Sequence, residues 1–266
     1  MNHTLRFPEL PERARPRWPL WYAPVALLSS FVALSFFLPA LPFILLGDFS
    51  DNLAALSLLV LLVVQDSFLM GAAWLFSSLS LRPRPWHFGL RPTPRWRTIG
   101  WAVLGFALMF GFELAYIAIL GVTESNVDEV GGDALIAGTL VSLAVVLVAP
   151  VSEEFFFRAF FYRALRTRLP VLAAAPIDGL VFGSLHYEGV HTAVILPVIA
   201  VFGIGQCLVY ERTGSLFAVI SIHAAFNTVA SLGTATVPAI VIGACVITAC
   251  LLLPARFPPA PAAIKT

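Results

Sequence analysis

Long apolar runs, each about as long as a lipid bilayer is thick, constrain this chain more than any other feature of its sequence. A bilayer-spanning helix needs about 20 consecutive apolar residues. We identify eight such runs, at residues 20–46, 52–81, 98–122, 135–162, 171–187, 192–209, 215–231 and 236–253. Only 12% of the residues are charged, whereas a soluble domain has about 25%. We therefore predict an all-α, polytopic bundle of transmembrane helices.

The basic residues lie on one side of these predicted spans. If the N-terminus is cytoplasmic, every Lys and Arg outside the spans falls in an inner segment, and the outer loops carry only acidic charges. This distribution follows the positive-inside rule, and an odd number of spans would break it. We predict one multi-pass domain over residues 1–266, with eight spans and both termini cytoplasmic, in the cell (inner or plasma) membrane.

The remaining composition narrows the partners. Fifteen of the sixteen basic residues are Arg, which we interpret as a compositional bias and not as a nucleic-acid surface. Cys207, Cys245 and Cys250 fall in apolar runs without metal-type spacing, so we expect thiols that face lipid or the core. The expected partners are the bilayer and a membrane-associated protein or peptide substrate, with no nucleic acid.

Several polar residues lie inside the apolar runs, where an ionisable group is costly and therefore points to a function. The ionisable ones are Asp66, Glu113, Glu153, Glu154, Arg158, Asp178, His186 and His223, and the uncharged ones are Gln206 and Asn227. We interpret Asp66 and Glu113 as polar anchors or cavity lining. Asp178 is expected near a helix start at the inner interface, where the helix dipole favours an acid.

Glu154 and Arg158 are four residues apart, so they share one helix face and can form an ion pair. Glu153 points about 100° away from Glu154. We therefore expect Arg158 to neutralise Glu154 and to leave Glu153 available for chemistry. The alternative is a buried ion pair with a spare acid. Pro150 interrupts the same run, and a kink is expected there.

Two further spans carry histidines. His186 follows Phe182 by four residues, and His223 precedes Asn227 by four, so His223 and Asn227 share a helix face. Either pair could simply hydrogen-bond a neighbouring helix. However, Glu153 lies ten residues before Arg163, His223 lies nine after Gly214, and His186 lies ten after Pro176 if that proline opens the membrane-embedded part of its span. At about 1.5 Å per residue all three are then about 15 Å deep, whereas a start at residue 171 would place His186 deeper. This coincidence favours a catalytic site.

The polar loop residues receive no catalytic role. The loop at residues 82–97 carries Trp86 and Trp96, and we interpret it as an interfacial anchor for anionic lipid. His3, His87 and His191 are expected in loops, without chemistry.

Three motifs on successive spans resemble those of the CAAX protease and bacteriocin-processing (CPBP, or Abi) family. They are Glu153-Glu154 with Arg158, Phe182 with His186, and His223 with Asn227, and the resemblance covers about residues 134–231. That family includes the Ras-converting type of CAAX prenyl endopeptidase. By resemblance, the catalytic residues are Glu153, Glu154, His186, His223 and Asn227, with Arg158 and Phe182 in support.

The resemblance implies an intramembrane endopeptidase in which Glu153 and His186 activate a water, while His223 and Asn227 stabilise the oxyanion. The substrate would be a prenylated CAAX-type peptide, a leader peptide or another membrane protein. The cofactor stays open. Glu153, His186 and His223 could hold Zn²⁺ with water as the fourth ligand, and a metal-free mechanism is equally compatible.

Two other functions compete with this hypothesis. The chain could be a non-catalytic membrane adaptor or bacteriocin-immunity protein, which would tolerate the loss of Glu153. It could also be a small transporter with a relay of buried acids, although the sequence has neither repeated halves nor paired broken helices. A cavity that opens sideways to lipid would favour the protease.

Overall fold

A computed structural model describes residues 18–36, 51–121, 134–187, 189–190, 192–233 and 235–260. Within these ranges every regular element is helical and no strand occurs, which confirms the predicted all-α class. The α-helices are α1 (Tyr22–Ser35), α3 (Asp51–Ser80), α4 (Arg95–Leu120), α5 (Ala134–Ser142), α6 (Ala149–Phe156), α7 (Tyr162–Arg166), α8 (Val171–Ser184), α9 (Leu196–Thr213), α10 (Leu216–Ala230) and α11 (Thr236–Leu252).

Four helical segments are long and apolar enough to cross a membrane, namely Asn52–Ser80, Arg95–Leu120, Leu135–Arg166 and Thr236–Arg256. Helices α1, α8 and α10 are apolar but shorter. The chain is thus a multi-pass membrane protein. The predicted total of eight spans stays a prediction, as does the location of the termini, which lie outside the described residues together with residues 37–50 of the first predicted span.

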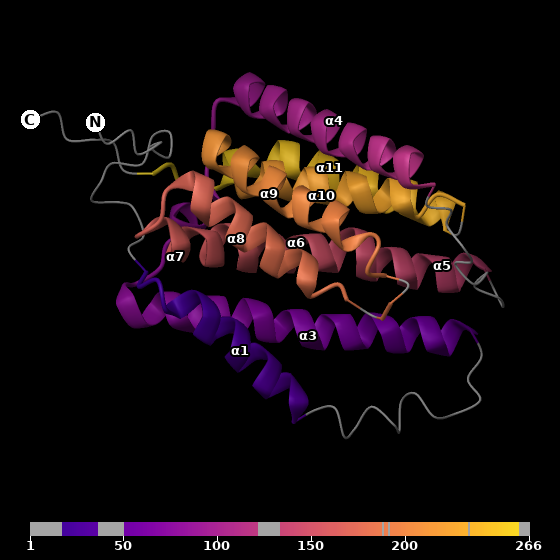
Figure 1. The fold of residues 1–266 in the computed structure, drawn as a ribbon, viewed down its shortest axis with the longest axis horizontal. Helices are drawn as coiled ribbons and strands as arrows, with labels where there is room; N and C mark the ends of the chain where they lie inside the picture. The colour runs from indigo at the N-terminus through magenta and orange to yellow at the C-terminus, as the bar shows by residue number, and fades with distance from the viewer. Residues whose placement is uncertain are drawn as a thin grey trace, which may run out of the picture.

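The helices run roughly alongside one another in a flattened bundle (Figure 1). Helices α3 and α1 pack together on one side, where α3 contacts α5 and α6. Helix α10 packs directly on α6, while α9 contacts the segment that follows α6 and α11 contacts the segment that precedes it; α4 packs outside α9 and α10. Helix α6 is therefore central, and the motif-bearing helices α8 and α10 lie next to it or its continuation.

The span around Glu153 is not a regular α-helix. Two π-helical segments flank α6: η4 (Leu143–Val148) and η5 (Phe157–Phe161). In η4 the Ala149 N–H bonds the carbonyl five residues back, at Ala144. In the same register the Val145 carbonyl would face the nitrogen of Pro150, which has no hydrogen. The disturbance expected at Pro150 therefore takes the form of a widened turn, while the second π segment was not predicted.

The turn between α9 and α10 has a local sequence cause. Gly214 ends α9 with a φ of +60°, which is the left-handed conformation that glycine adopts without steric cost. Ser215 then caps α10 by accepting a hydrogen bond from the Ala218 N–H at 3.4 Å. This turn sets the start of the helix that carries His223.

The loops predicted to face the cytoplasm meet at one end of the bundle. Leu216 N–H donates to the Gly89 carbonyl at 3.1 Å, and Arg91 Nε donates to the Gly214 carbonyl at 3.3 Å. The lipid anchor expected at residues 82–97 stays a prediction, although Phe88 and Arg91 in this segment are 1% and 2% exposed and pack on protein. Trp96 is 82% exposed and remains available to lipid.

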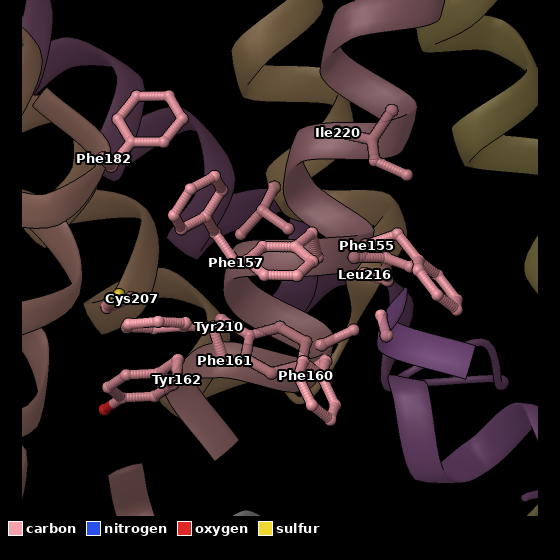
Figure 2. Close-up of a cluster of buried hydrophobic side chains, with 14 of the residues drawn as sticks. Phe155, Phe157, Phe160, Phe161, Tyr162, Phe182, Cys207, Tyr210, Leu216 and Ile220 are labelled. Atoms are coloured by element: carbon pink, nitrogen blue, oxygen red, sulfur yellow. The ribbon is translucent and has the colours of Figure 1, made fainter. Parts of the chain in front are cut away.

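An aromatic cluster holds the central helix in place. Phe155, Phe157, Phe160 and Phe161 project from α6 and η5 and are buried (Figure 2). They pack against side chains from several other helices, including Phe182, Tyr210, Leu216 and Ile220. The cluster fixes the orientation of the segment that carries the two adjacent glutamates.

Candidate active site

The two adjacent glutamates of α6 have different partners. Glu154 is fully buried, and its Oε1 accepts from Arg158 Nη1 at 3.2 Å and from His223 Nδ1 at 2.8 Å. The ion pair predicted from the spacing of four is therefore present. Since one oxygen accepts both bonds, His223 donates through Nδ1, and in the neutral ring its Nε2 is the acceptor.

Arg158 is a buried cation that joins three helices. Its Nη2 donates to the Gly203 carbonyl of α9 at 3.2 Å, and its Nε lies 3.8 Å from Asp178 Oδ1 of α8. The guanidinium also stacks on the Phe182 ring, 4.5 Å from the ring centroid. The predicted supporting role of Arg158 and Phe182 is consistent with these contacts.

Asp178 corrects one sequence interpretation. It was expected at the inner interface near a helix start, but it is the eighth residue of α8 and fully buried. Its Oδ1 lies near Arg158 and accepts from Cys207 Sγ at 3.1 Å. A signal was available, because Asp178, Phe182 and His186 are spaced by four and so share one face of α8.

Glycines allow α8 and α9 to approach this ion cluster closely. A Cβ on Gly203 would lie 2.8 Å from the Gly179 Cα and 3.3 Å from Arg158 Nη2. Real Cβ atoms do not approach a backbone carbon so closely. The Gly203 carbonyl can therefore reach Arg158 only because no side chain intervenes.

Glu153 is in a different position. Its Oε2 lies 3.9 Å from His223 Nε2, beyond hydrogen-bond distance, and is buried with no hydrogen-bond partner among the described residues. Its side chain keeps 16% exposure, whereas that of Glu154 has none. The structure therefore leaves Glu153 as a carboxylate that faces an imidazole across a gap.

His186 lies just beyond the C-terminal end of α8. Its Nδ1 is 2.8 Å from the Phe182 carbonyl, which can only accept, so Nδ1 carries the hydrogen and Nε2 is the acceptor nitrogen of the neutral ring. The centroid of its ring lies 4.8 Å from that of the Phe182 ring, at a tilt of 51°, and the Phe182 centroid is 6.1 Å from that of His223. Phe182 thus connects the two imidazoles.

Asn227 lies one turn after His223 on α10. Its Nδ2 donates to the Val145 carbonyl at 2.6 Å, the acceptor that Pro150 leaves without a backbone donor. The π turn thereby fixes the amide, which has a second hydrogen for another acceptor. The structure thus brings Glu153, Glu154 and His223 together. Asn227 lies on the same helix face as His223, and His186 contacts the Phe182 ring.

The donors of the predicted zinc set are not assembled in this structure. Among the described residues, no group of three or more His, Cys, Asp or Glu side chains is arranged to hold a metal ion. Glu153 and His223 are near each other, while His186 bonds the Phe182 carbonyl through Nδ1 and not through Nε2. As positioned, Glu153, His186 and His223 do not form a zinc set.

A cavity of about 270 Å³ opens beside α6, between α3 and η4. It is lined by Val63, Asp66, Ser67, Met70, Leu147, Val148, Val151 and Ser152. Val63 and Leu147 are 42% and 37% exposed on the outer surface of the bundle, so the mouth faces sideways. The expectation that Asp66 lines a cavity is confirmed. Glu113 is half-buried on α4, and its predicted role stays a prediction.

The segment that carries the three motifs is similar to a known family. Residues 135–229 match the family described as type II CAAX prenyl endopeptidase, Rce1-like. Neither a search of curated proteins nor one of solved structures gave a significant match. The matched segment contains η4, α6, α8 and α10 with all the motif residues. Residues 135–229, about a third of the chain, are therefore similar to the CAAX prenyl endopeptidase family, which supports the resemblance found in the three motifs.

Proposed function

We propose that this protein is an intramembrane endopeptidase that hydrolyses a peptide bond of a membrane-associated substrate. One observation carries the proposal. Of two adjacent buried glutamates, Glu154 is occupied by Arg158 and His223, whereas Glu153 faces His223 at 3.9 Å without a hydrogen-bond partner in the described residues. A carboxylate held in this way is suited to act as a general base.

In the proposed reaction, Glu153 takes a proton from a water molecule while the water oxygen attacks the carbonyl carbon of the substrate. His186, through Nε2, orients this water. The carbonyl π bond opens to an oxyanion. When the tetrahedral intermediate collapses, the C–N bond breaks and Glu153 returns the proton to the leaving amine. A new carboxyl group and a new amine result, so the atoms balance.

His223 and Asn227 are proposed to stabilise the oxyanion. Asn227 contributes its second amide hydrogen, since the first is bonded to Val145. His223 donates through Nε2 only when its ring carries two protons, because Nδ1 already donates to Glu154. Glu154 and Arg158 therefore act by positioning His223, not by contacting the reacting atoms.

The sideways cavity supports a substrate that arrives from the lipid. Its lining includes Ser152, the residue directly before Glu153. A peptide segment in the bilayer could reach the site between α3 and α6 without crossing the loops. This favours a membrane-anchored substrate, either a prenylated CAAX-type peptide or a leader peptide, over a soluble one.

Cleavage by detergent-purified protein tests the proposal. Wild type, Glu153→Gln and Glu113→Gln would be incubated with a prenylated CAAX peptide and with a panel of membrane-anchored peptides. Glu113→Gln is the matched control, since it removes a span carboxylate outside the motifs. We expect cleavage by wild type and Glu113→Gln, and at least about a 10²-fold loss in Glu153→Gln.

Three further outcomes are informative. Addition of phenanthroline decides between the metal-dependent and the direct mechanism, because only the former loses activity. If Glu153→Gln cleaves as fast as wild type, the proposed chemistry is wrong. If neither cleaves any substrate while both remain folded, the adaptor or immunity function becomes the better hypothesis.

A further inference from the structure

Asp66 on α3 is a buried acid without a partner. It is 2% exposed, and both of its carboxyl oxygens lack a hydrogen bond within the described part of the chain. Burial of a carboxyl group without compensating bonds is costly, and most buried polar atoms in proteins have a partner. A buried carboxyl group without a partner therefore suggests that a ligand supplies the missing hydrogen bond or positive charge.

The surroundings of Asp66 leave it as the dominant polar group of the sideways cavity. Ser67 donates its hydroxyl to the Val63 carbonyl at 2.6 Å. Ser152 lies beside Asp66, but its hydroxyl is directed to the Val148 and Ala149 carbonyls at 2.9 and 3.1 Å. The other lining side chains, Val63, Met70, Leu147, Val148 and Val151, are apolar.

The cavity also lies next to the proposed site of chemistry. Ser152 in its wall precedes Glu153, and the Asp66 carboxyl interacts electrostatically with that of Glu153. The nearby cation, Arg158, is already engaged by Glu154 and Asp178. A positive charge that satisfied Asp66 would therefore have to come from outside the cluster.

We propose that the Asp66 cavity is a specificity site that takes a Lys or Arg side chain of the substrate, close to the scissile bond. This inference rests on the proposed protease function. A cavity of about 270 Å³ has room for one long side chain. Its apolar walls fit the aliphatic part of such a side chain, and the carboxylate fits the terminal cation. The mouth, between exposed Val63 and Leu147, faces the direction from which a membrane-anchored peptide would enter.

The test measures binding separately from cleavage. In lipid nanodiscs, the Glu153→Gln variant would be titrated with a lipid-tethered apolar peptide that has one guest position. The guest residue would be Lys, Arg, norleucine, Gln or Glu. It would be placed in turn at each position on either side of the peptide bond that wild type cleaves. We expect Lys and Arg to bind at least about tenfold more tightly than norleucine at one position.

Substitution of Asp66 assigns the preference to this side chain. Asp66→Asn, almost isosteric, should abolish the preference for Lys and Arg, and Asp66→Lys should shift it to Glu. Glu113→Gln, which removes a span carboxyl group on α4 outside the cavity, should retain the wild-type order. The inference is overturned if no position prefers a basic guest, if Gln binds as well as Lys, or if the preference survives in Asp66→Asn.

The two proposals fail in different ways. If the basic preference in binding is present but wild type cleaves none of the peptides, the cavity assignment stands and the protease function falls. If wild type cleaves the norleucine and Lys peptides at equal rates and binds them equally, the protease function stands and the cavity assignment falls.

Discussion

Replacement of Arg158 by Met would test the buried ion cluster most directly. The guanidinium is fully buried and lies 3.2 Å from Glu154 and 3.8 Å from Asp178. Its removal leaves two buried carboxyl groups without their cation, and loss of one partner from a buried pair costs about 3–5 kcal/mol. The Gly203 carbonyl also loses its donor, which adds about 1–3 kcal/mol.

The matching control removes the charges together. In the triple variant Glu154→Gln, Arg158→Met and Asp178→Asn, no buried charge is left without a partner, and replacement of a whole buried ion cluster is often close to neutral. We therefore expect Arg158→Met to lower the free energy of unfolding by at least about 3 kcal/mol, and the triple variant to recover most of this loss.

Reversible unfolding in mixed micelles, followed by circular dichroism, would measure both values. If Arg158→Met unfolds at the same denaturant mole fraction as wild type, the guanidinium does not hold the cluster together. If the triple variant is as unstable as the single one, the loss comes from packing on Phe182 and not from uncompensated charge.

Three more predictions follow from local geometry. Gly203→Ala should destabilise the protein by about 1–3 kcal/mol through overpacking, because its Cβ would lie 2.8 Å from Gly179 Cα. The control Gly111→Ala should be neutral or stabilising in the same unfolding assay, because nothing lies within 4 Å of its Cβ. Asn227→Ala should abolish cleavage and lower the free energy of unfolding by about 1–3 kcal/mol, because the Val145 carbonyl loses its donor. The added substitution Pro150→Ala supplies a backbone N–H and should recover stability but not activity. Equal stability of the single and double variants would contradict this account. Burial, with Arg163 and Arg84 nearby, lowers the pKa of His87 from 6.5 to about 4. The unfolded chain therefore binds more protons between these pH values, and stability should fall as pH drops from 6.5 to 4. His87→Asn should flatten this dependence in thermal melts, and an unchanged slope would show that other groups cause it.

The sequence predicted the helices well, because apolar length and charge distribution are local properties. Each predicted span overlaps a described helix, and the pairing of Glu154 with Arg158 followed from helical spacing. The π segments around Glu153 were missed, since nothing in an apolar run distinguishes a wide turn from an α-turn. Asp178 was misplaced because its partner Arg158 belongs to another helix. The bond from Arg91 to the Gly214 carbonyl was not predicted for the same reason, since this acceptor lies far along the chain.

The candidate site was only partly predictable. Counting residues along the spans predicted the same depth for Glu153 and His223, and the structure places Glu153 Oε2 3.9 Å from His223 Nε2. The same argument could not show that His186 would bond its own helix at Phe182. It also could not show that Glu154 would fix the His223 ring. Depth specifies a layer of the bilayer, whereas rotation of each side chain depends on neighbours that only the packed bundle supplies.

The buried ion cluster also has a consequence for biogenesis. A segment that carries Glu153, Glu154 and Arg158 is a poor candidate for independent release into lipid, because each charged group at the centre of a span costs about 2.5–3.5 kcal/mol on insertion scales. Its partners Asp178 and His223 lie on helices that are synthesised later. Newly made α6 must therefore stay in a sheltered, hydrated environment, at the insertion machinery, until α8 and α10 arrive. The chemistry of the site would in this way require the second half of the bundle to enter the membrane as a unit.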